Sequence, residues 1–524
     1  MTYEVIIVGA GASGTFAAMQ LRGKKVLVVD VGNTPSAGAA ALQGNLYDLR
    51  RAREEMHDEL IGEAYESLHN ISHEYLSPKL KAPLLRYVVD ETAALSPIVS
   101  DGFYTVTSHA RGGMANAWGA GVFPFTDREL KGFPITASDL APYYRALTEH
   151  IGISGTTDDL AADFPDNGAL QPPLALSRIG TDLLSRYEQR RSAVQRRGIR
   201  IGRSRLAVLT REHHGRAACE YDNLEFFKPH IPAVYNPAYT LDELVRDGQI
   251  DYRPRSLALS YEEREDGVAL RVRDLTTQTE HTVTAKKIVI AAGTLNSSRL
   301  VLRSRNDLSA RLPLLDNKIS YVPFLQPWLI GGALEEKSFA TAQLSVVYER
   351  DPAPLFSTFY GLTGPLRSDY LLKFPLTLRD NIAAAKYLSP AMAIVQVFYP
   401  DVPHPENHVS LNAGGALQIA YGRQEAELIE RELIRAFLRL GYFSHPSLCQ
   451  FPTAGNSFHY AGTLPMQREP GPYQTHASGR LSDTRHVYIA DGAALTWLPS
   501  KNLTFTLMAN AMRVADHVRK DLGG

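Results

Sequence analysis

The glycine-rich stretch Gly9-Ala-Gly-Ala-Ser-Gly14 constrains the fold of this chain more than any other feature. It follows the short apolar run Glu4–Val8 and leads into Thr15–Leu21, whose apolar residues have helical spacing. A second apolar run, Val26–Val29, comes next and ends in Asp30. A strand, a glycine turn, a helix and a second strand within about 30 residues form a β-α-β unit. This part of the chain therefore predicts a parallel α/β sheet.

Each glycine of this loop has its own physical task in a nucleotide-binding unit. The first permits a tight turn, the second lets backbone approach a pyrophosphate, and the third lets the helix pack closely on the strand. The positive end of the helix dipole then faces the phosphates, and the Asp30 carboxylate can accept hydrogen bonds from an adenosine ribose. The unit predicts a dinucleotide without distinguishing FAD from NAD. The residues expected to contact it are Gly9, Gly11, Ala12, Ser13, Gly14 and Asp30.

A second strand-and-helix unit near the carboxyl terminus favours FAD. His486–Ala490 has the pattern of a strand that ends at Asp491-Gly492, and a helix is predicted over Asn502–Lys520. Proteins that combine an amino-terminal nucleotide loop with such a unit generally bind FAD along its length. The acid then meets the ribityl or pyrophosphate region, and the helix dipole stabilises negative charge on a reduced flavin. The residues expected to contact FAD here are Asp491, Gly492, Asn502, Leu503 and Thr504.

Charge and cysteine content exclude several classes of protein. Acidic and basic residues nearly cancel over 524 residues, giving a formal charge of -1, so no nucleic-acid partner is expected. We find no secretory signal and no apolar run of the ~20 residues that a membrane helix needs. Cys219 and Cys449 suit a reducing cytosol as two buried thiols, the alternative being that they pair in the fold. His213 and His214 have no further ligands at metal-binding spacing. We expect a cytoplasmic protein without a metal or a membrane span.

Residues 310–450 differ in character from the rest of the chain. They carry many aromatic residues and prolines, which favours an antiparallel sheet, and Glu425–Leu440 is a clear helix among them. Nucleotide-binding features lie on both sides of this region, so the two domains must be interleaved. The predicted fold class is α/β, with a doubly wound, Rossmann-like FAD-binding domain and an α+β substrate domain built on an antiparallel sheet. The predicted boundaries are 1–155, 205–310 and 455–524 for the FAD-binding domain, and 156–204 and 311–454 for the substrate-binding domain.

Four stretches, in order along the chain, resemble the glucose–methanol–choline (GMC) family, whose members are flavoenzymes that oxidise alcohols. Besides the glycine loop, these stretches are Ala110-Arg-Gly-Gly-Met-Ala-Asn-Ala-Trp-Gly-Ala-Gly121, Ala291-Ala-Gly-Thr-Leu-Asn-Ser-Ser-Arg-Leu-Val-Leu-Arg-Ser304 and His459-Tyr-Ala-Gly-Thr463. Residues 110–121 are similar to the family's Gly-Gly loop over the flavin. Residues 291–304 are similar to another family signature, although Arg305 stands where a final Gly is usual. Pro134–Tyr144 resembles a helix of the pyranose-oxidase and sugar-dehydrogenase branch.

The resemblance implies FAD and adds residues that contact it. These are Gly112, Gly113, Met114, Asn116, Ala117, Trp118, Ala292 and Gly293. In the pyranose-oxidase branch, a His immediately before the Trp of the Gly-Gly loop can carry the flavin covalently. Ala117 occupies that position and has no nucleophile. The resemblance with this departure therefore implies FAD that is bound non-covalently.

The resemblance also implies that the protein oxidises an alcohol to a carbonyl. The reaction removes a hydroxyl proton and transfers the carbinol hydride to flavin N5. His459 is the candidate base, since an imidazole with an ordinary pKa of ~6.5 can accept a proton near neutral pH. Asn502 occupies the family's partner position and can hydrogen-bond the substrate oxygen, but it cannot take the proton. The expected substrate is a sugar, a polyol or a hydroxyl group of a secondary metabolite.

Two other functions agree with the same motifs. Hydroxynitrile lyases of this family keep FAD and use the His as acid and base without net oxidation. An FAD-binding scaffold without activity is the third possibility. The motifs also leave the electron acceptor open between O2, a quinone and a redox protein.

Overall fold

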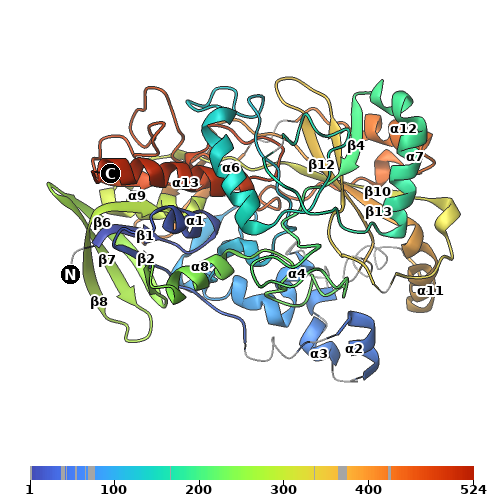
Figure 1. The fold of residues 1–524 in the computed structure, drawn as a ribbon, viewed down its shortest axis with the longest axis horizontal. Helices are drawn as coiled ribbons and strands as arrows, with labels where there is room; N and C mark the ends of the chain where they lie inside the picture. Colours follow the sequence, from blue (N-terminus) through green and yellow to red (C-terminus); the bar gives the residue numbers. More distant parts are fainter. Residues whose placement is uncertain are drawn as a thin grey trace.

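A computed structural model of the chain describes residues 3–36, 42, 44–52, 56–64, 66–68, 77–165, 167–335, 337–363, 367, 375–422 and 426–523. A mixed sheet lies at the end of the molecule where both termini are found, and an antiparallel sheet lies at the other end (Figure 1). The strands of the mixed sheet are β1 Tyr3–Val8, β2 Val26–Val29, β5 Asp251–Arg253, β6 Ser256–Arg264, β7 Gly267–Asp274, β8 Glu280–Ile290 and β16 Val487–Ile489.

The centre of the mixed sheet is parallel, as the glycine loop predicted. β1 pairs with β2 on one side and with β8 on the other, so that Val8 lies opposite Val29 and Ile290. The long strand β8 changes partner along its length, because β7 pairs antiparallel with its first half and β16 pairs parallel with its second half. Strands buried on both faces carry continuous apolar runs. The carboxyl ends of β1, β2, β8 and β16 therefore meet at one edge of the sheet.

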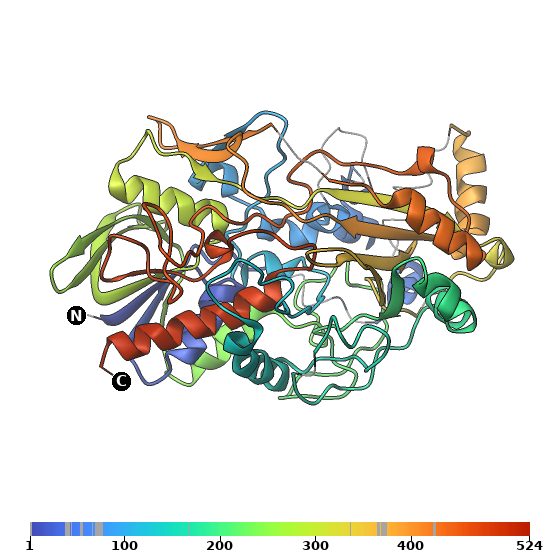
Figure 2. The same ribbon diagram turned by 90° about the horizontal axis from the view of Figure 1, so that it is seen from above.

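Helices from distant parts of the sequence cover this sheet. They are α1 Ala12–Gln20, α6 Ala137–Ile151, α8 Pro237–Arg246, α9 Thr294–Arg305 and α13 Thr504–Asp521. α13 packs against α1 and α6, which brings the two ends of the chain together (Figure 2). The stretch Pro134–Tyr144, which resembles a family helix, leads into and forms much of α6, and a capping box formed by Thr136 and Asp139 satisfies the first turn of this helix.

The antiparallel sheet predicted for the second domain is also present. In spatial order its strands are β10 Ile319–Leu325, β13 Met392–Phe398, β12 Leu355–Gly361, β11 Leu344–Tyr348 and β4 Ile199–Arg203. α7 Arg178–Gln195 and α12 Glu430–Arg439 bury apolar side chains against one face of this sheet. The other face turns toward the interior of the molecule. The fold class predicted from the sequence is therefore confirmed.

A small third sheet connects the two halves. Its strands are β3 Ile98–Ser100, β15 Leu417–Tyr421, β14 Asn407–Leu411 and β9 Leu312–Pro313. Val409, Leu417 and Ile419 belong to the same apolar core as the mixed sheet. This sheet therefore packs with the mixed sheet, although its strands come from both sides of the antiparallel sheet in sequence.

The remaining elements are short. They are α2 Leu46–Ala52, α3 Met56–Ile61, η2 Glu66–Leu68, α4 Pro78–Lys81, η3 Pro83–Val88, α5 Thr92–Leu95, η4 Gly113–Asn116, η5 Pro327–Leu329, α11 Leu378–Leu388, η6 Ser389–Ala391, η7 Pro446–Leu448 and η8 Gly492–Ala494. Within the described ranges, no helix combines the length and the apolar character needed to cross a lipid bilayer.

Candidate active site

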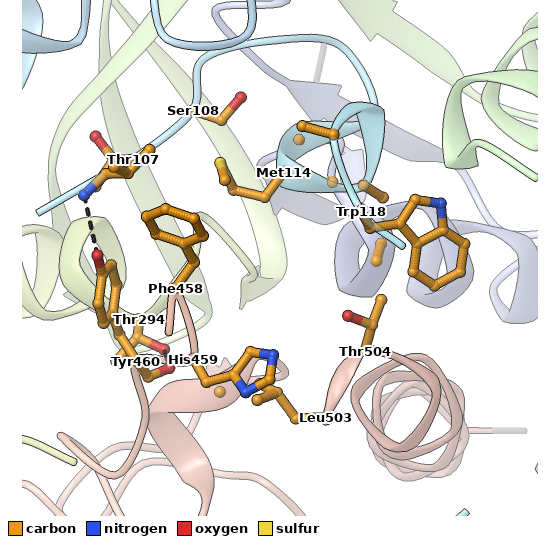
Figure 3. A pocket seen from close by; sticks show the side chains of 18 of the residues that line it. Thr107, Ser108, Met114, Trp118, Thr294, Phe458, His459, Tyr460, Leu503 and Thr504 are labelled. Carbon is orange, nitrogen blue, oxygen red and sulfur yellow. Dashed lines mark hydrogen bonds between the residues drawn. The ribbon is translucent and has the colours of Figure 1, made fainter. Parts of the chain in front are cut away.

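A cavity of about 910 Å³ lies between the carboxyl edge of the mixed sheet and the inner face of the antiparallel sheet. Ligands of open α/β sheets bind in this position, outside the carboxyl ends of parallel strands. Figure 3 shows part of its wall: His459, Leu503 and Thr504 lie across the open space from Met114. All but three of the residues predicted to form the site line the cavity. The three that do not are Gly14, Gly112 and Asn116.

The glycine loop meets the cavity through its first two glycines. Gly9 has a φ of +98°, and a Cβ there would lie 2.5 Å from the carbonyl oxygen of Ala291. Gly14 faces away from the cavity, and a Cβ on it would overlap the carbonyl oxygen of Gly9. A Cβ on Gly11 would meet no atom closer than the Cα of Gly113 at 3.7 Å. The fold therefore needs Gly9 and Gly14, whereas Gly11 leaves open space on the cavity side.

Asp30 lies directly after β2 and lines the cavity. Burial raises the pKa of its carboxyl to about 7, because the charged form loses water. The phenol of Tyr252 donates a hydrogen bond to Oδ2 at 3.2 Å. A carboxylate has room for about four hydrogen bonds. The environment thus favours a ligand that donates further hydrogen bonds to Asp30, as the two hydroxyls of a ribose do.

The Gly-Gly loop is held in shape by Asn116, which lies behind it. The side-chain amide of Asn116 donates to the carbonyl oxygens of Arg111 at 2.9 Å and Gly113 at 2.7 Å, and its Oδ1 accepts from Tyr87 at 2.8 Å. Trp118 donates its indole N–H to the carbonyl oxygen of Tyr235 at 2.9 Å, which turns the ring away from the centre of the cavity (Figure 3). Asn116 therefore orients the loop and lies outside the cavity wall.

Asp491 connects two of the motifs. Its Oδ2 accepts hydrogen bonds from the Gly293 N–H at 2.9 Å and the Ser297 hydroxyl at 2.5 Å, and its Oδ1 accepts from the Ala493 N–H at 3.0 Å. Both carboxylate oxygens are therefore bound within the protein. The end of β16 and the start of α9 are held together at the cavity wall, where Gly293 and Gly492 present backbone to the cavity.

The hydrogen bonds around His459 assign its tautomer. The side-chain N–H groups of Asn317 donate to the carbonyl oxygens of Tyr399 at 2.7 Å and Pro499 at 3.0 Å. This orients Oδ1 of Asn317 toward Nδ1 of His459, at 2.9 Å. An amide oxygen can only accept, so the neutral imidazole carries its proton on Nδ1. Its Nε2 is left as a hydrogen-bond acceptor.

The surroundings keep His459 neutral. Burial lowers the pKa of the imidazole to about 4, since the charged form loses water. The ring stacks on Phe398, with centroids 5.2 Å apart and planes at 21°. The preceding backbone is anchored as well: Asp316 accepts from the Ser457 hydroxyl at 2.5 Å, and that hydroxyl accepts from the His459 N–H at 3.0 Å. Adjacent residues 316 and 317 thus hold both the main chain and the ring.

The position of Asn502 differs in one respect from the sequence expectation. The last helix begins at Thr504, with Leu503 at its N-cap position, so Asn502 neither starts nor caps the helix. Within the part of the chain that the structure describes, the buried Oδ1 of Asn502 has no hydrogen-bond partner. The boundary was predicted two residues too early, because sequence patterns locate the end of a helix only to within a few residues. Asn502 lines the cavity, so its carboxamide oxygen is available to a ligand there.

A buried ion pair supports the segment that carries Asn502. The Lys501 ammonium lies 3.1 Å from the Glu129 carboxylate, and both side chains are almost fully buried. Lys501 also donates to the carbonyl oxygens of Pro124 at 3.1 Å and Asp163 at 2.8 Å. These bonds join the segment to two other parts of the chain. No motif pointed to Lys501 or Glu129, because their partners are distant in sequence.

The described residues do not gather metal-binding side chains into a cluster at this site. No cluster of three or more His, Cys, Asp or Glu side chains with suitable geometry occurs in the described ranges. The Nε2 of His213 bonds to the carbonyl oxygen of Glu149 at 2.7 Å. Cys219 and Cys449 are both free thiols, and burial raises the pKa of each.

Sequence reasoning missed the residues that the antiparallel sheet brings to the cavity. Tyr321, Thr358, Gln396 and Phe398 all line it. The one available signal was the alternation within β13, where Ile394, Gln396 and Phe398 fall on one face of the strand. Asn317 carried no local signal at all.

Comparison with known proteins agrees with the motifs. No family model matches the chain. The 6'''-hydroxyparomomycin C oxidase of Streptomyces lividus is 26% identical over 439 residues, which cover 74% of this chain and 73% of that protein. The paromamine 6'-oxidase of Streptomyces fradiae is 23% identical over 582 residues, covering 99% of this chain and 92% of that protein.

A solved structure shares the fold over nearly the whole chain. Pyridoxine 4-oxidase from Mesorbium loti superimposes with a TM-score of 0.58, covering 98% of this chain and 99% of that chain at 14% identity. The four sequence motifs converge on one cavity within this fold, and the two sequence relatives are oxidases. In its motifs and in its fold, the chain resembles the glucose–methanol–choline oxidoreductases.

Proposed function

We propose that the protein binds FAD in the cavity and oxidises an alcohol to a carbonyl, with His459 as the base. The observation that carries this proposal is the hydrogen bond from Nδ1 of His459 to Oδ1 of Asn317, which leaves Nε2 as a proton acceptor. The neutral state favoured by burial keeps that acceptor available over most of the pH range. The two sequence relatives and the structural neighbour are all oxidases, which supports an oxidation reaction.

The residues around the cavity fit FAD. Gly11 leaves room for a pyrophosphate at the start of α1, and Asp30 is a buried carboxyl suited to ribose hydroxyls. The cavity continues from there past Gly293 and Gly492 to Met114 and the start of α13. Its volume of about 910 Å³ lies at the upper end of the range for ligand pockets. We infer non-covalent binding, because Ala117 offers no nucleophile to the flavin.

We propose a division of labour between the two domains. Residues 1–155, 205–310 and 455–524 would hold the cofactor, since they supply every strand of the mixed sheet. Residues 156–204 and 311–454 would form the substrate wall, since they supply every strand of the antiparallel sheet. The base lies at the meeting point, because His459 belongs to the first set while Asn317 and Phe398 belong to the second.

In this mechanism the side chains bind and orient the alcohol and move one proton. FAD, when bound, supplies the acceptor for the carbinol hydride. Nε2 of His459 takes the hydroxyl proton, and the Nδ1–H bond to Asn317 keeps the ring in place as it becomes charged. Asn502 hydrogen-bonds the substrate oxygen through its carboxamide and fixes the direction of the reacting C–H bond. Phe398 covers one face of the imidazole and excludes water from it.

Anaerobic mixing with candidate alcohols tests the proposal. Bleaching of the flavin absorbance together with carbonyl formation is the expected result. Carbonyl release from a cyanohydrin with an unbleached flavin would instead indicate a lyase. A flavin that dithionite bleaches but no alcohol bleaches would contradict alcohol oxidation. The relatives' names support O2 as the electron acceptor, which reoxidation by air after substrate reduction would measure.

A further inference from the structure

The overall charge of -1 conceals one strongly basic segment, which forms α7 and the two residues after Gln195. Against the acids Asp182 and Glu188, it carries Arg178, Arg186, Arg190, Arg191, Arg196 and Arg197. Arg186 pairs with Asp182 at 2.8 Å, and Arg191 pairs with Asp159 at 3.1 Å. The other four are exposed and form no ion pair with any residue that the structure describes: Arg178, Arg190, Arg196 and Arg197.

Exposed apolar side chains lie beside this basic helix. Trp328 of η5 is 72% exposed, and its ring centroid lies 5.8 Å from the guanidinium carbon of Arg186 on α7. On α11, Leu378 and Ile382 are 69% and 63% exposed, whereas Asn381 is buried. A surface helix of a soluble protein ordinarily turns its apolar side chains toward the core. The orientation of α11 is the reverse of this rule.

The apolar and basic elements share one end of the molecule. The N–H of Gly331, just after η5, donates to the carbonyl oxygen of Tyr387 on α11 at 2.9 Å. Figure 1 shows α7 and α11 at the end away from both termini, and Figure 2 shows the same arrangement from above. We call this region the end surface. Its exposed apolar and basic residues are Trp328, Ile330, Leu378, Ile382, Tyr387, Arg178, Arg190, Arg196 and Arg197.

The end surface carries an excess of positive charge. α7 with residues 196–197, η5 and α11 together contain eight Arg or Lys and three Asp or Glu. Of the acids, Asp182 is paired with Arg186, and Asp380 accepts a hydrogen bond from the Thr377 hydroxyl at 2.8 Å. A binding partner of this surface should therefore be anionic.

The two kinds of side chain together fit an anionic lipid bilayer. An arginine guanidinium forms paired hydrogen bonds with a phosphate group. Aromatic and aliphatic side chains next to arginines bury themselves at the boundary between headgroups and acyl chains. A symmetric contact with a second copy of this chain fits less well, because it would face the same unpaired arginines toward each other.

We propose that the end surface docks on the anionic phospholipids of a membrane. The arginines of α7 contact the headgroup phosphates, and Trp328, Leu378 and Ile382 enter the interface. The docking is peripheral and uses side chains of short surface elements. This inference goes beyond the proposed oxidation and does not depend on it, so its test needs no substrate.

Co-sedimentation of the purified holoprotein with vesicles tests the docking. Vesicles of equal parts phosphatidylcholine and phosphatidylglycerol should bind the protein at low salt, and phosphatidylcholine vesicles should bind it about 10-fold more weakly or worse. Binding should weaken as NaCl rises from about 0.1 M to about 1 M, because the Debye length falls from about 10 Å to about 3 Å. The absence of binding to anionic vesicles at low salt would overturn the proposal.

The fluorescence of Trp328 reports on the apolar part of the end surface. Anionic vesicles should shift the tryptophan emission to shorter wavelength as the exposed indole leaves water. Trp328→Phe should abolish this shift, because Trp118 and Trp497 are half-buried and bonded to carbonyl oxygens within the protein. An equal shift in Trp328→Phe would show that Trp328 does not enter the lipid and would overturn that part of the assignment.

Paired variants locate the contact. Arg196→Gln with Arg197→Gln should weaken binding to anionic vesicles by about 10-fold or more, since each cation near the surface contributes roughly 5-fold. Leu378→Ser with Ile382→Ser should weaken binding by a similar factor. The matched controls lie at exposed positions elsewhere and should change binding by less than about 2-fold: Arg264→Gln with Lys286→Gln, and Leu308→Ser. Thermal unfolding should show that all variants remain folded. Equal weakening by the controls would overturn the assignment to the end surface.

Two other partners are outcomes of the same experiments. Retention of the protein on immobilised polyglutamate without vesicle binding would assign the surface to an acidic protein and overturn the proposal. A dimer that Leu378→Ser with Ile382→Ser abolishes in sedimentation velocity, without vesicle binding, would assign the surface to a second copy and overturn it as well.

Discussion

The Nδ1 of His459 lies 2.9 Å from the Oδ1 of Asn317, and this contact determines which ring nitrogen carries the proton. Both N–H groups of the Asn317 amide are donated to carbonyl oxygens, so the amide cannot turn over without losing both bonds. The proton of the neutral imidazole is thereby held on Nδ1. A histidine oriented in this way is ready to accept a proton at Nε2 without first changing tautomer.

Substitution of Asn317 should alter the pH dependence of the reaction. In the native protein, the acid limb of kcat/KM for flavin reduction should lie near pH 4, where His459 becomes protonated. The free imidazole pKa is higher, so burial extends activity to lower pH. Asn317→Asp places a negative charge beside the ring and should move the acid limb upward by about 1 to 3 units. Anaerobic stopped-flow measurements across pH, with Asn412→Asp as control, would measure the shift.

Removal of the Asn317 carboxamide should affect the reaction differently from its replacement by a carboxylate. Asn317→Leu should lower the rate of flavin reduction by ~10² or more, because the imidazole can then take the wrong tautomer. Nitrogen-15 NMR of His459 should report a mixture of tautomers in this variant and only the Nδ1–H form in the native protein. A native spectrum dominated by the Nε2–H form would contradict the assignment.

Substitution of the base should separate chemistry from cofactor binding. His459→Ala should lose at least ~10² in the rate of flavin reduction, the usual scale for a general base. The variant should retain its flavin, because the predicted FAD contacts lie on other segments of the wall. The flavin absorbance of the purified protein and anaerobic stopped-flow reduction measure the two properties. His281→Ala, at an exposed position of β8, serves as control. An unchanged reduction rate in His459→Ala would refute the role.

The glycines of the nucleotide loop should respond differently to alanine. A Cβ at Gly14 would overlap the carbonyl oxygen of Gly9, so Gly14→Ala should destabilise the apoprotein by about 1–3 kcal/mol or more. Gly11 has a φ of -75° and open space at its Cβ position, so Gly11→Ala should leave apoprotein stability within about 0.5 kcal/mol. Gly11→Ala should nevertheless weaken FAD binding, since the methyl group occupies the approach to the pyrophosphate. Thermal unfolding and flavin titration of the apoproteins distinguish the two effects. Equal losses of stability in Gly11→Ala and Gly14→Ala would contradict the different roles assigned to the two glycines.

The buried ion pair beside Asn502 should show strong coupling. Lys501→Met leaves the Glu129 carboxylate buried without its partner and should cost about 3–5 kcal/mol. Lys501→Met combined with Glu129→Gln removes both charges and should recover much of that loss. Urea unfolding of the single and double variants measures the coupling. Additive losses in the double variant would mean that the two charges do not interact.

The attachment of the cofactor can be tested by acid precipitation. Because Ala117 has no nucleophilic side chain, the flavin should stay in the supernatant and leave a colourless pellet. Ala117→His, the residue found at this position in the pyranose-oxidase branch, is the informative companion. A yellow pellet from the native protein would show covalent attachment elsewhere on the chain.

Local patterns predicted the backbone elements well. The unit of β1, the glycine loop, α1 and β2 follows from side-chain periodicity and from the close contacts of Gly9 and Gly14, and the predicted strand before Asp491 is β16. The start of the last helix was less well predicted, because the helix begins at Thr504 and Asn502 lies outside it. The motifs and their order also indicated the family resemblance and the candidate base His459, because each motif is contiguous in sequence and can be read without the fold.

The sequence by itself therefore determined the fold class and nominated His459 as the candidate base. Only the tertiary structure decided how that histidine is held and which side chains line its cavity. Asn317 is 142 residues away from His459 in sequence. Tyr321, Gln396 and Thr358 lie side by side on three strands, and no local pattern encodes the register of those strands. The physical reason is that strand periodicity and turn geometry act over a few residues, whereas a hydrogen bond across a cavity depends on how distant segments pack.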